Sequence, residues 1–179
     1  MIWRQTALSG VWVLDIESRE DERGFFARGW CRREAAERGL HPAWVQMNMS
    51  LSRRAGTLRG MHWQEAPWRE AKLVRCVAGA LWDVAVDLRA GSPTYLRWHG
   101  EELSARNRRA LYVPEGCAHG LLTLEDNTEV HYLVSQHYAP EAERGARWDD
   151  PLLAIAWPRP VEVISAKDSR WPLLEARRS

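Results

Sequence analysis

The possible folds of this sequence are limited above all by short strand-like segments that turn residues interrupt at close intervals. Residues 82–88 (WDVAVDL) alternate in hydrophobicity with the period of two typical of a β-strand, and the turn sequence at 89–93 (RAGSP) ends them. Residues 110–113 (ALYV) stop before Pro114, and residues 129–137 (EVHYLVSQH) stop before a proline. Many short strands at regular spacing favour an all-β sandwich or barrel.

Helical signal is confined to one segment. Residues 31–39 (CRREAAERG) are charged, alanine-rich and closed by a glycine, as expected of a short surface helix. From about residue 158, three prolines predict an irregular strap with a short helix that packs on the barrel. The 179 residues contain no repeat or linker, so we expect residues 1–179 to form one domain.

Composition excludes several classes of partner. Hydrophobic residues make up 45% of the chain and charged residues 27%, and the net charge is +1, so we expect neither a nucleic-acid nor a membrane partner. Three cysteines, Cys31, Cys76 and Cys117, have no Cys-x-x-Cys spacing and are expected to be reduced thiols. The chain shows no signal-peptide pattern and no long apolar run, which predicts a cytoplasmic protein.

A histidine and two cations lie close together in residues 56–64 (GTLRGMHWQ) and the following Lys72. Strand alternation cannot place Arg59 and His62 on one face unless a bulge at Gly60 adds a residue. Two interpretations remain open: a functional face built through such a bulge, or an exposed arginine beside a core histidine.

In a second segment, residues 112–120 (YVPEGCAHG), a proline and two glycines predict a tight turn, and His119 follows it at the start of a strand. This segment resembles the second sequence motif of cupins. Metal-binding cupins generally carry two histidines two residues apart, a carboxylate and this later histidine. Trp63 and Gln64 follow His62, so that pair is missing, and His131 and His137 are six residues apart. We therefore expect no metal and no cofactor.

Two more polar segments stand near the end of the chain. Residues 130–147 contain Tyr132, Tyr138 and Glu143, and residues 164–168 (ISAKD) contain Lys167 and Asp168. From these residues alone, Tyr132 is equally well a half-buried strand aromatic, and ISAKD a solvated turn.

Taken together, the polar segments match one family in order and spacing. The matching segments are Asp21-x-Arg23-Gly24-x-Phe26, Gln46-x-Asn48-x-Ser50-x-Ser52, Arg59-Gly60-Met61-His62-Trp63-Gln64, Lys72-Leu73-Val74, Asp83-Val84-Ala85-Val86-Asp87-Leu88-Arg89, Pro114-x-Gly116-x-Ala118-His119-Gly120, Tyr132, Tyr138-x-Pro140, Trp148-x-Asp150-Pro151 and Ser165-x-Lys167-Asp168. In these segments the chain resembles the dTDP-4-dehydrorhamnose 3,5-epimerases, cupin enzymes of deoxysugar biosynthesis.

The resemblance implies a cupin-type jelly-roll β-barrel with short peripheral helices, usually dimeric, whose N-terminal strand joins the partner's sheet. It also implies metal-independent inversion of the carbons beside the ketone of a nucleotide-linked 4-keto-6-deoxyhexose. In that family His62 would be the base, Asp168 its orienting carboxylate, Tyr132 the acid and Lys72 the group near the ketone oxygen. The implied substrate-binding residues are Arg23, Phe26, Arg28, Gln46, Asn48, Arg59, His119, Tyr138, Glu143 and Lys167.

These residue types suit that chemistry. Removal of a hydrogen beside a ketone leaves an enolate, whose charge a fixed cation such as Lys72 would stabilise. Inversion requires one group that takes a proton and another that returns one on the opposite face, and a carboxylate partner fixes the tautomer of the histidine. Arginine near the diphosphate would bind its oxygens in a bidentate manner.

Two positions depart from the family pattern. Arg28 stands where the family usually carries an acid near the nucleotide, so it either contacts a base edge or phosphate of a different nucleotide, or points to solvent. Met47 and Met49 occupy a segment where the family often shows a polar residue after the glutamine, and we expect them to reshape the sugar pocket.

Other functions remain open. A mono-epimerase of a dTDP-, CDP- or GDP-linked keto sugar would use the same residues, and a 3,4-ketoisomerase would use the same barrel. A non-catalytic cupin that binds a sugar nucleotide should have lost one of the acid–base groups, and none is missing. A metal-dependent oxygenase conflicts with the histidine spacing.

Overall fold

The computed structural model describes residues 1–41 and 43–175, and its secondary structure is mainly β. The strands are β1 (Ile2–Gln5), β2 (Trp12–Asp15), β3 (Arg19–Asp21), β4 (Gly24–Phe26), β5 (Gln46–Ser52), β6 (Thr57–Gln64), β7 (Lys72–Ala78), β8 (Ala80–Asp87), β9 (Trp98–Ser104), β10 (Ala110–Val113), β11 (Cys117–Thr123), β12 (Thr128–Val134), β13 (Glu143–Gly145) and β14 (Val163–Ile164). The helical elements are α1 (Arg32–Ala36) and the 3₁₀ turns η1 (Pro140–Ala142) and η2 (Asp168–Arg170).

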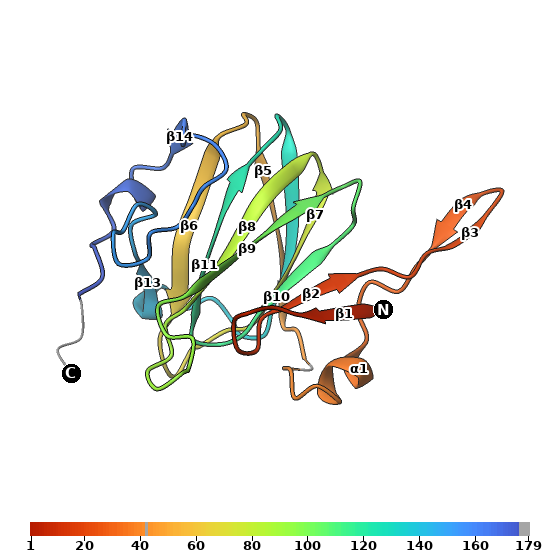
Figure 1. Cartoon of the computed structure of the whole chain (residues 1–179), viewed down its shortest axis with the longest axis horizontal. Helices are drawn as coiled ribbons and strands as arrows, with labels where there is room; N and C mark the ends of the chain where they lie inside the picture. The colour runs from red at the N-terminus through yellow and green to blue at the C-terminus, as the bar shows by residue number, and fades with distance from the viewer. Residues whose placement is uncertain (42, 176–179) are drawn as a thin grey trace.

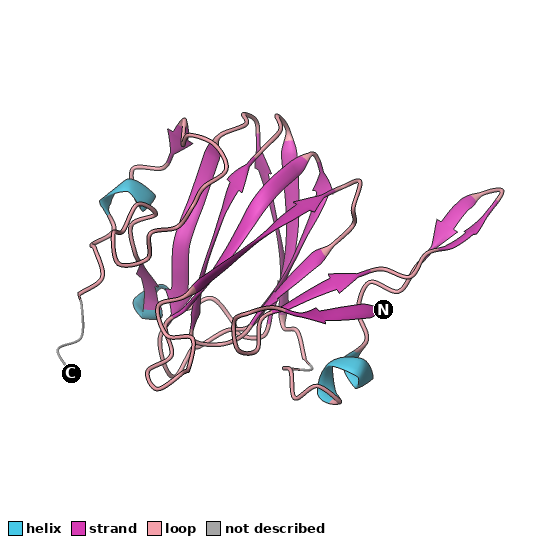
Figure 2. Cartoon of the chain, viewed as in Figure 1, coloured by secondary structure: helices cyan, strands magenta, loops and turns pink. Residues whose placement is uncertain are grey.

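Two large sheets face each other across the molecule (Figure 1). The first has the order β1-β2-β10-β7-β12-β5, and the second has the order β13-β6-β11-β8-β9, with β14 paired to β6. Apart from that parallel β14–β6 pair, the strand pairs of both sheets are antiparallel (Figure 2). The all-β, jelly-roll class of fold expected from the sequence is confirmed.

The space between the sheets is apolar at one end and polar at the other. On β7 the inward side chains are Lys72, Val74 and Cys76, and the last two belong to a buried cluster that both sheets supply. The members of this cluster are Leu8, Val11, Val13, Val74, Cys76, Leu81, Ala85, Leu103, Leu111, Val113, Cys117, Leu121 and Val130. These side chains fill the apolar part of the space between the sheets, and Lys72 lies where the lining becomes polar.

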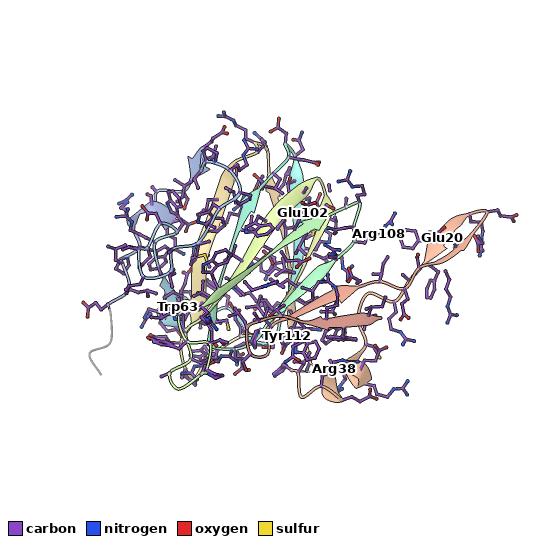
Figure 3. The ribbon with its side chains drawn as sticks, in the orientation of Figure 1. Glu20, Arg38, Trp63, Glu102, Arg108 and Tyr112 are labelled. Atoms are coloured by element: carbon purple, nitrogen blue, oxygen red, sulfur yellow. The ribbon has the colours of Figure 1, made fainter. Side chains whose placement is uncertain are left out.

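Tryptophans cover the outer faces of the sheets. Trp3, Trp12, Trp30 and Trp44 surround the buried Tyr112 on the outside of the first sheet, beside α1. In Figure 3, Tyr112 lies between the body of the sheet and Arg38, whose guanidinium stacks on Trp3. The large indole surfaces thus bury the sheet faces without a second helical layer.

Two segments extend the two-sheet body. The β3–β4 hairpin projects away from the sheets (Figure 1), and its contact with them includes Arg108, whose guanidinium lies 4.2 Å from the centre of the Phe25 ring. Arg108 and Glu20 mark the two sides of this junction in Figure 3. At the other end, residues 158–175 run beside β6 as an irregular strap that contains β14 and η2. In the part of the chain that the structure describes, no helix is long and apolar enough to cross a membrane.

Candidate active site

The polar end of the space between the sheets contains a cavity of about 490 Å³. A second cavity of about 320 Å³ adjoins it and shares His62, Lys72 and Tyr132 with it. Strands of both sheets and the strap supply the walls. The residues that line one or both cavities and were predicted from the sequence are Gln46, Asn48, Arg59, His62, Lys72, His119, Tyr132, Tyr138, Glu143, Lys167 and Asp168.

A bulge in β6 brings Arg59 and His62 to the same face. His62 pairs with His119 of β11, and Arg59 pairs with Leu121, so three steps along β6 match two steps along β11. The extra residue lies at Gly60, which has a φ of +128°. The structure therefore has the bulge that the first interpretation requires. Arg59 is exposed and His62 is partly buried, and both side chains line the larger cavity.

His62 is paired with a carboxylate from the strap. Its Nε2 lies 2.7 Å from Oδ1 of Asp168, while Oδ2 of Asp168 accepts a hydrogen bond of 3.3 Å from the Gly60 amide. Burial raises the pKa of Asp168, but the hydrogen bond and charge of His62, the Gly60 amide and the Ser165 hydroxyl outweigh it and hold the pKa below its usual value. Because Asp168 is ionised, the proton of neutral His62 lies on Nε2 and the lone pair on Nδ1.

Tyr132 faces His62 from the other sheet. Burial of the phenol raises the pKa of Tyr132, and the carboxylate of Glu70 raises it further. Glu70 also binds Lys72, with 3.1 Å between Oε1 and Nζ. The phenol of Tyr132 is therefore protonated at neutral pH and able to donate a proton. The Lys72 amino group, which Glu70 binds, lines the same cavity.

Two further nitrogen-bearing side chains, Arg59 and His119, are fixed by protein oxygen atoms. Nε of Arg59 donates to Ser52 Oγ at 3.2 Å, and a terminal nitrogen of Arg59 donates to the Leu51 carbonyl at 3.1 Å. Nε2 of His119 lies 2.7 Å from Oδ1 of Asp83, a fully buried carboxylate on β8. Both groups line the larger cavity and could bind an anion there.

At the mouth, three side chains join the barrel to the strap. Glu143 accepts hydrogen bonds from the Tyr138 hydroxyl at 2.9 Å and from Lys167 Nζ at 2.6 Å. Gln46 fixes the same loop, because its Oε1 accepts the Tyr138 amide at 2.9 Å. The exposed Tyr138 ring is thereby held at the rim of the smaller cavity.

Arg23, Phe26 and Arg28 lie away from both cavities within the single chain. Arg23 pairs with Asp21 of its own hairpin, and Phe26 is 73% exposed. Arg28 donates to Glu34 of α1 at 3.1 Å. The sequence predicted that these three residues bind the substrate together with the cavity residues. Within one chain they lie apart from the cavities, because the β3–β4 hairpin projects outward.

The expectation for Met47 and Met49 is wrong. β5 alternates, so Gln46, Asn48 and Ser50 face the cavities, while both methionines point outward, with Met49 69% exposed. They form part of the outer surface of the first sheet and do not shape the sugar pocket of their own chain.

Sequence reasoning did not single out three carboxylate or hydroxyl groups that support the site: Glu70, Asp83 and Ser165. Each acts on a named residue, Glu70 on Lys72, Asp83 on His119, and Ser165 on Asp168. Asp83 and Ser165 stand in segments that match the family pattern, whereas Glu70 lies in none of them. In residues 1–41 and 43–175, no group of three or more His, Cys, Asp and Glu side chains is arranged to hold a metal ion.

A jelly roll with a carboxylate-oriented histidine on one sheet and a partly buried phenol on the other defines the class of protein: a cupin-type barrel equipped for proton transfer. Comparisons with known proteins then specify the family. A sequence model described as dTDP-4-dehydrorhamnose 3,5-epimerase matches residues 5–176.

Individual relatives agree over nearly the whole chain. The dTDP-4-dehydrorhamnose 3,5-epimerase of Sinorhizobium fredii is 44% identical over 97% of this chain and 90% of that protein. The dTDP-4-dehydrorhamnose 3-epimerase of Streptomyces niveus is 43% identical over 97% of this chain and 84% of that protein. The crystal structure of the Bacillus anthracis 3,5-epimerase with TDP and PPi bound has a TM-score of 0.92 and 40% identity, over 97% of this chain and 99% of that chain. The chain belongs to the dTDP-4-dehydrorhamnose 3,5-epimerase family.

Proposed function

We propose that the protein is an isomerase that epimerises a dTDP-linked 4-keto-6-deoxyhexose at carbons 3 and 5, without a metal. The observation that carries this proposal is that His62 and Tyr132 line one cavity from opposite sheets. A sugar ring bound between them would present one face to a base and the other to an acid, as inversion requires.

The residues divide the reaction into two proton transfers. His62, with its Nε2 held by Asp168, takes the proton of the carbon beside the ketone through the lone pair on Nδ1. The electrons move onto the ketone oxygen, where Lys72 stabilises the enolate charge. Tyr132 then donates its proton to the opposite face of the same carbon, which completes the inversion and leaves a phenolate to be reprotonated.

Arg59 and His119 are suited to the diphosphate, because both are polar groups fixed in the cavity by protein acceptors. Tyr138, Glu143 and Lys167 at the rim are suited to the nucleoside. The TDP and PPi bound in the Bacillus anthracis relative support a thymidine nucleotide here as well.

A mono-epimerase is the second candidate, favoured by the 43% identity to the Streptomyces niveus 3-epimerase. Both reactions would use the same proton donor and acceptor, and they differ only in which carbons of the bound ring reach them.

We further propose that the protein acts as a cytoplasmic homodimer. The outer face of β5 exposes Met47, Met49 and Leu51, an apolar strip at a sheet edge that a second copy would cover. In such a dimer the projecting hairpin of one chain would carry Arg23, Phe26 and Arg28 to the cavity of the other.

Proton NMR of the protein with dTDP-4-keto-6-deoxyglucose in D₂O tests this function. With chelator present, deuterium entering at both carbon 3 and carbon 5 is the expected result. Deuterium at one carbon identifies a mono-epimerase. Absence of exchange with dTDP-, CDP- and GDP-linked keto sugars, together with retained nucleotide binding, would contradict any epimerase function.

A further inference from the structure

Trp171 lies directly against the proposed base, on the same short turn as Asp168. The centres of the His62 and Trp171 rings are 6.1 Å apart with an angle of 68° between their planes, an edge-to-face arrangement. η2 carries Asp168 at its start, and Trp171 follows its last residue, Arg170. One segment of the strap thus contacts His62 twice, through a hydrogen bond to Nε2 and through an indole ring.

The barrel wall is shaped to admit this indole. Gly145 of β13 lies opposite His62 in the β13–β6 pair. A Cβ atom built on Gly145 would overlap Cε2, Cδ2 and Nε1 of Trp171. The indole therefore occupies the space that any side chain at position 145 would fill, next to the backbone of His62.

The placement of this indole also leaves its polar atom without a partner among the described residues. The indole Nε1 is buried and has no hydrogen-bond partner within residues 1–41 and 43–175. An unsatisfied buried N–H destabilises a fold, and a phenyl ring would fill much of the same space without that penalty. Lys167 Nζ lies 5.7 Å from the indole centre, which ties the ring to the Glu143–Lys167 pair at the mouth.

We propose that Trp171 is a positioning residue for the reaction, which acts by fixing the orientation of the His62 ring. Asp168 alone fixes one ring nitrogen and leaves rotation of the imidazole about that hydrogen bond open. The indole edge against the ring restricts this rotation and keeps Nδ1 directed at the bound sugar. This inference rests on the proposed function for its kinetic consequence, but the restriction of the ring is independent of any substrate.

Four variants test the inference: Trp171→Ala, Trp171→Phe, Gly145→Ala and the double variant Trp171→Ala/Gly145→Ala. Imidazole ¹⁵N NMR of the protein without substrate, with the His62 signals assigned from His62→Gln, reports the tautomer and order of the ring. We expect Trp171→Ala to replace the single Nε2–H form with averaged signals. Its kcat should fall by up to about 100-fold, because a small misplacement of a reacting group has that effect, while KM changes little.

The remaining variants separate positioning from general packing. Trp171→Phe should recover most of the lost kcat, since it restores an aromatic edge. Gly145→Ala should lower kcat by displacing the indole, and should have no further effect in the Trp171→Ala background. The matched control is Trp98→Ala on β9, at the far edge of the same sheet, which truncates another partly buried indole and should lower stability without changing the His62 signals.

Two results would overturn the proposal: unchanged His62 signals and kcat in folded Trp171→Ala, or a full additive effect of Gly145→Ala when the indole is already absent. Altered His62 signals in Trp171→Ala, in a protein whose wild type exchanges no sugar proton, would support the positioning and refute the proposed epimerase function. The two hypotheses therefore fail in distinguishable ways.

Discussion

At the scale of single residues, the protonation of Tyr132 decides which half of the proposed reaction it can perform. Its burial and the nearby Glu70 raise the pKa of the phenol, so the group carries its proton at neutral and mildly alkaline pH. A protonated phenol can complete an inversion but cannot begin one. The first step is thereby left to His62.

We expect Tyr132→Phe to retain proton removal and to lose inversion. Deuterium should enter the substrate in D₂O, while formation of the inverted product falls by about 100-fold or more, as for the loss of a general acid. Proton NMR of the sugar measures both quantities in one sample. His62→Ala is the matched control, because it should abolish exchange and product together. Product formation by Tyr132→Phe at the wild-type rate would show that another group is the acid.

Asp87 provides a pH-dependent contribution to stability outside the site. Burial raises the pKa of this carboxyl, but hydrogen bonds from Arg89, Ser92 and Thr94 outweigh burial and hold the pKa well below its usual value. A group whose pKa is lower in the folded chain stabilises the fold above its unfolded pKa of about 4. That stabilisation is lost as the pH falls from there through the folded pKa.

Asp87→Asn should therefore lower the free energy of unfolding by about 2–3 kcal/mol at pH 7, and by less at pH 3. Urea unfolding at both pH values measures the difference from wild type. Asp149→Asn removes an exposed pair with Arg147 and should cost less than about 1 kcal/mol at either pH. If Asp87→Asn lowers the free energy of unfolding by the same amount at pH 3 and at pH 7, this interpretation is contradicted.

At the scale of elements, the bulge in β6 depends on a residue without a side chain. A Cβ atom on Gly60 would lie 2.5 Å from Gly120 Cα and 3.0 Å from the His119 carbonyl oxygen. Gly24 has a similar φ, +123° against +128°, but a Cβ there would have no neighbour within 4 Å. The two glycines thus share a backbone conformation and differ in the space around it.

We expect Gly60→Ala to be more destabilising than Gly24→Ala by about 1–3 kcal/mol, the cost of forcing atoms into a packed site. Urea unfolding of both variants measures this difference. Because both glycines have the same backbone conformation, the strain that alanine adds to the backbone is the same in the two variants and cancels. Gly60→Ala should also displace His62 and reduce turnover. Equal destabilisation by the two substitutions would mean that the β6–β11 contact is not tight.

Local patterns predicted the strands that alternation and turn residues define together. Residues 110–113 are β10, residues 82–88 overlap β8, and residues 31–39 contain α1. The pairing of β14 with β6 could not be predicted, because β14 is two residues long and its pairing depends on contacts more than 100 positions away in sequence. Strands this short owe their conformation to the sheet edge that they join.

In the candidate site, the sequence predicted the residues that stand in family motifs. It did not predict the residues outside those motifs that hold them in place. His62 and Asp168 came from the family resemblance and meet at 2.7 Å. Glu70 and Trp171 have no such local signal, since a charge before a strand and a tryptophan before a proline are ordinary surface patterns. Their importance appears only when the fold brings them against Lys72 and His62.

At the scale of the whole molecule, the outward hairpin predicts a site shared between two chains. Arg23→Ala and His62→Ala should each be inactive alone. In a mixed dimer, one site would carry both substitutions and the other would carry neither. Coexpression should therefore recover about a quarter of wild-type activity for random pairing of a two-fold symmetric dimer.

Size-exclusion chromatography with light scattering should give twice the 20.7 kDa mass of the chain. Copurification of the two variants through a tag carried by only one of them is the control that mixed dimers form. Mixed dimers without recovered activity would show that the hairpin serves its own chain or does not reach a cavity at all.

The strap also determines when activity can arise during synthesis. Apart from the two-residue β14 of the strap, every strand of the two facing sheets precedes residue 146, whereas Lys167, Asp168 and Trp171 follow it. A ribosome releases a chain from its N-terminal side, so the barrel can form its hydrogen bonds while the strap is still in the exit tunnel. A nascent chain would thus hold an ordered cavity in which His62 has no carboxylate partner, and proton transfer would begin only when the last segment docks.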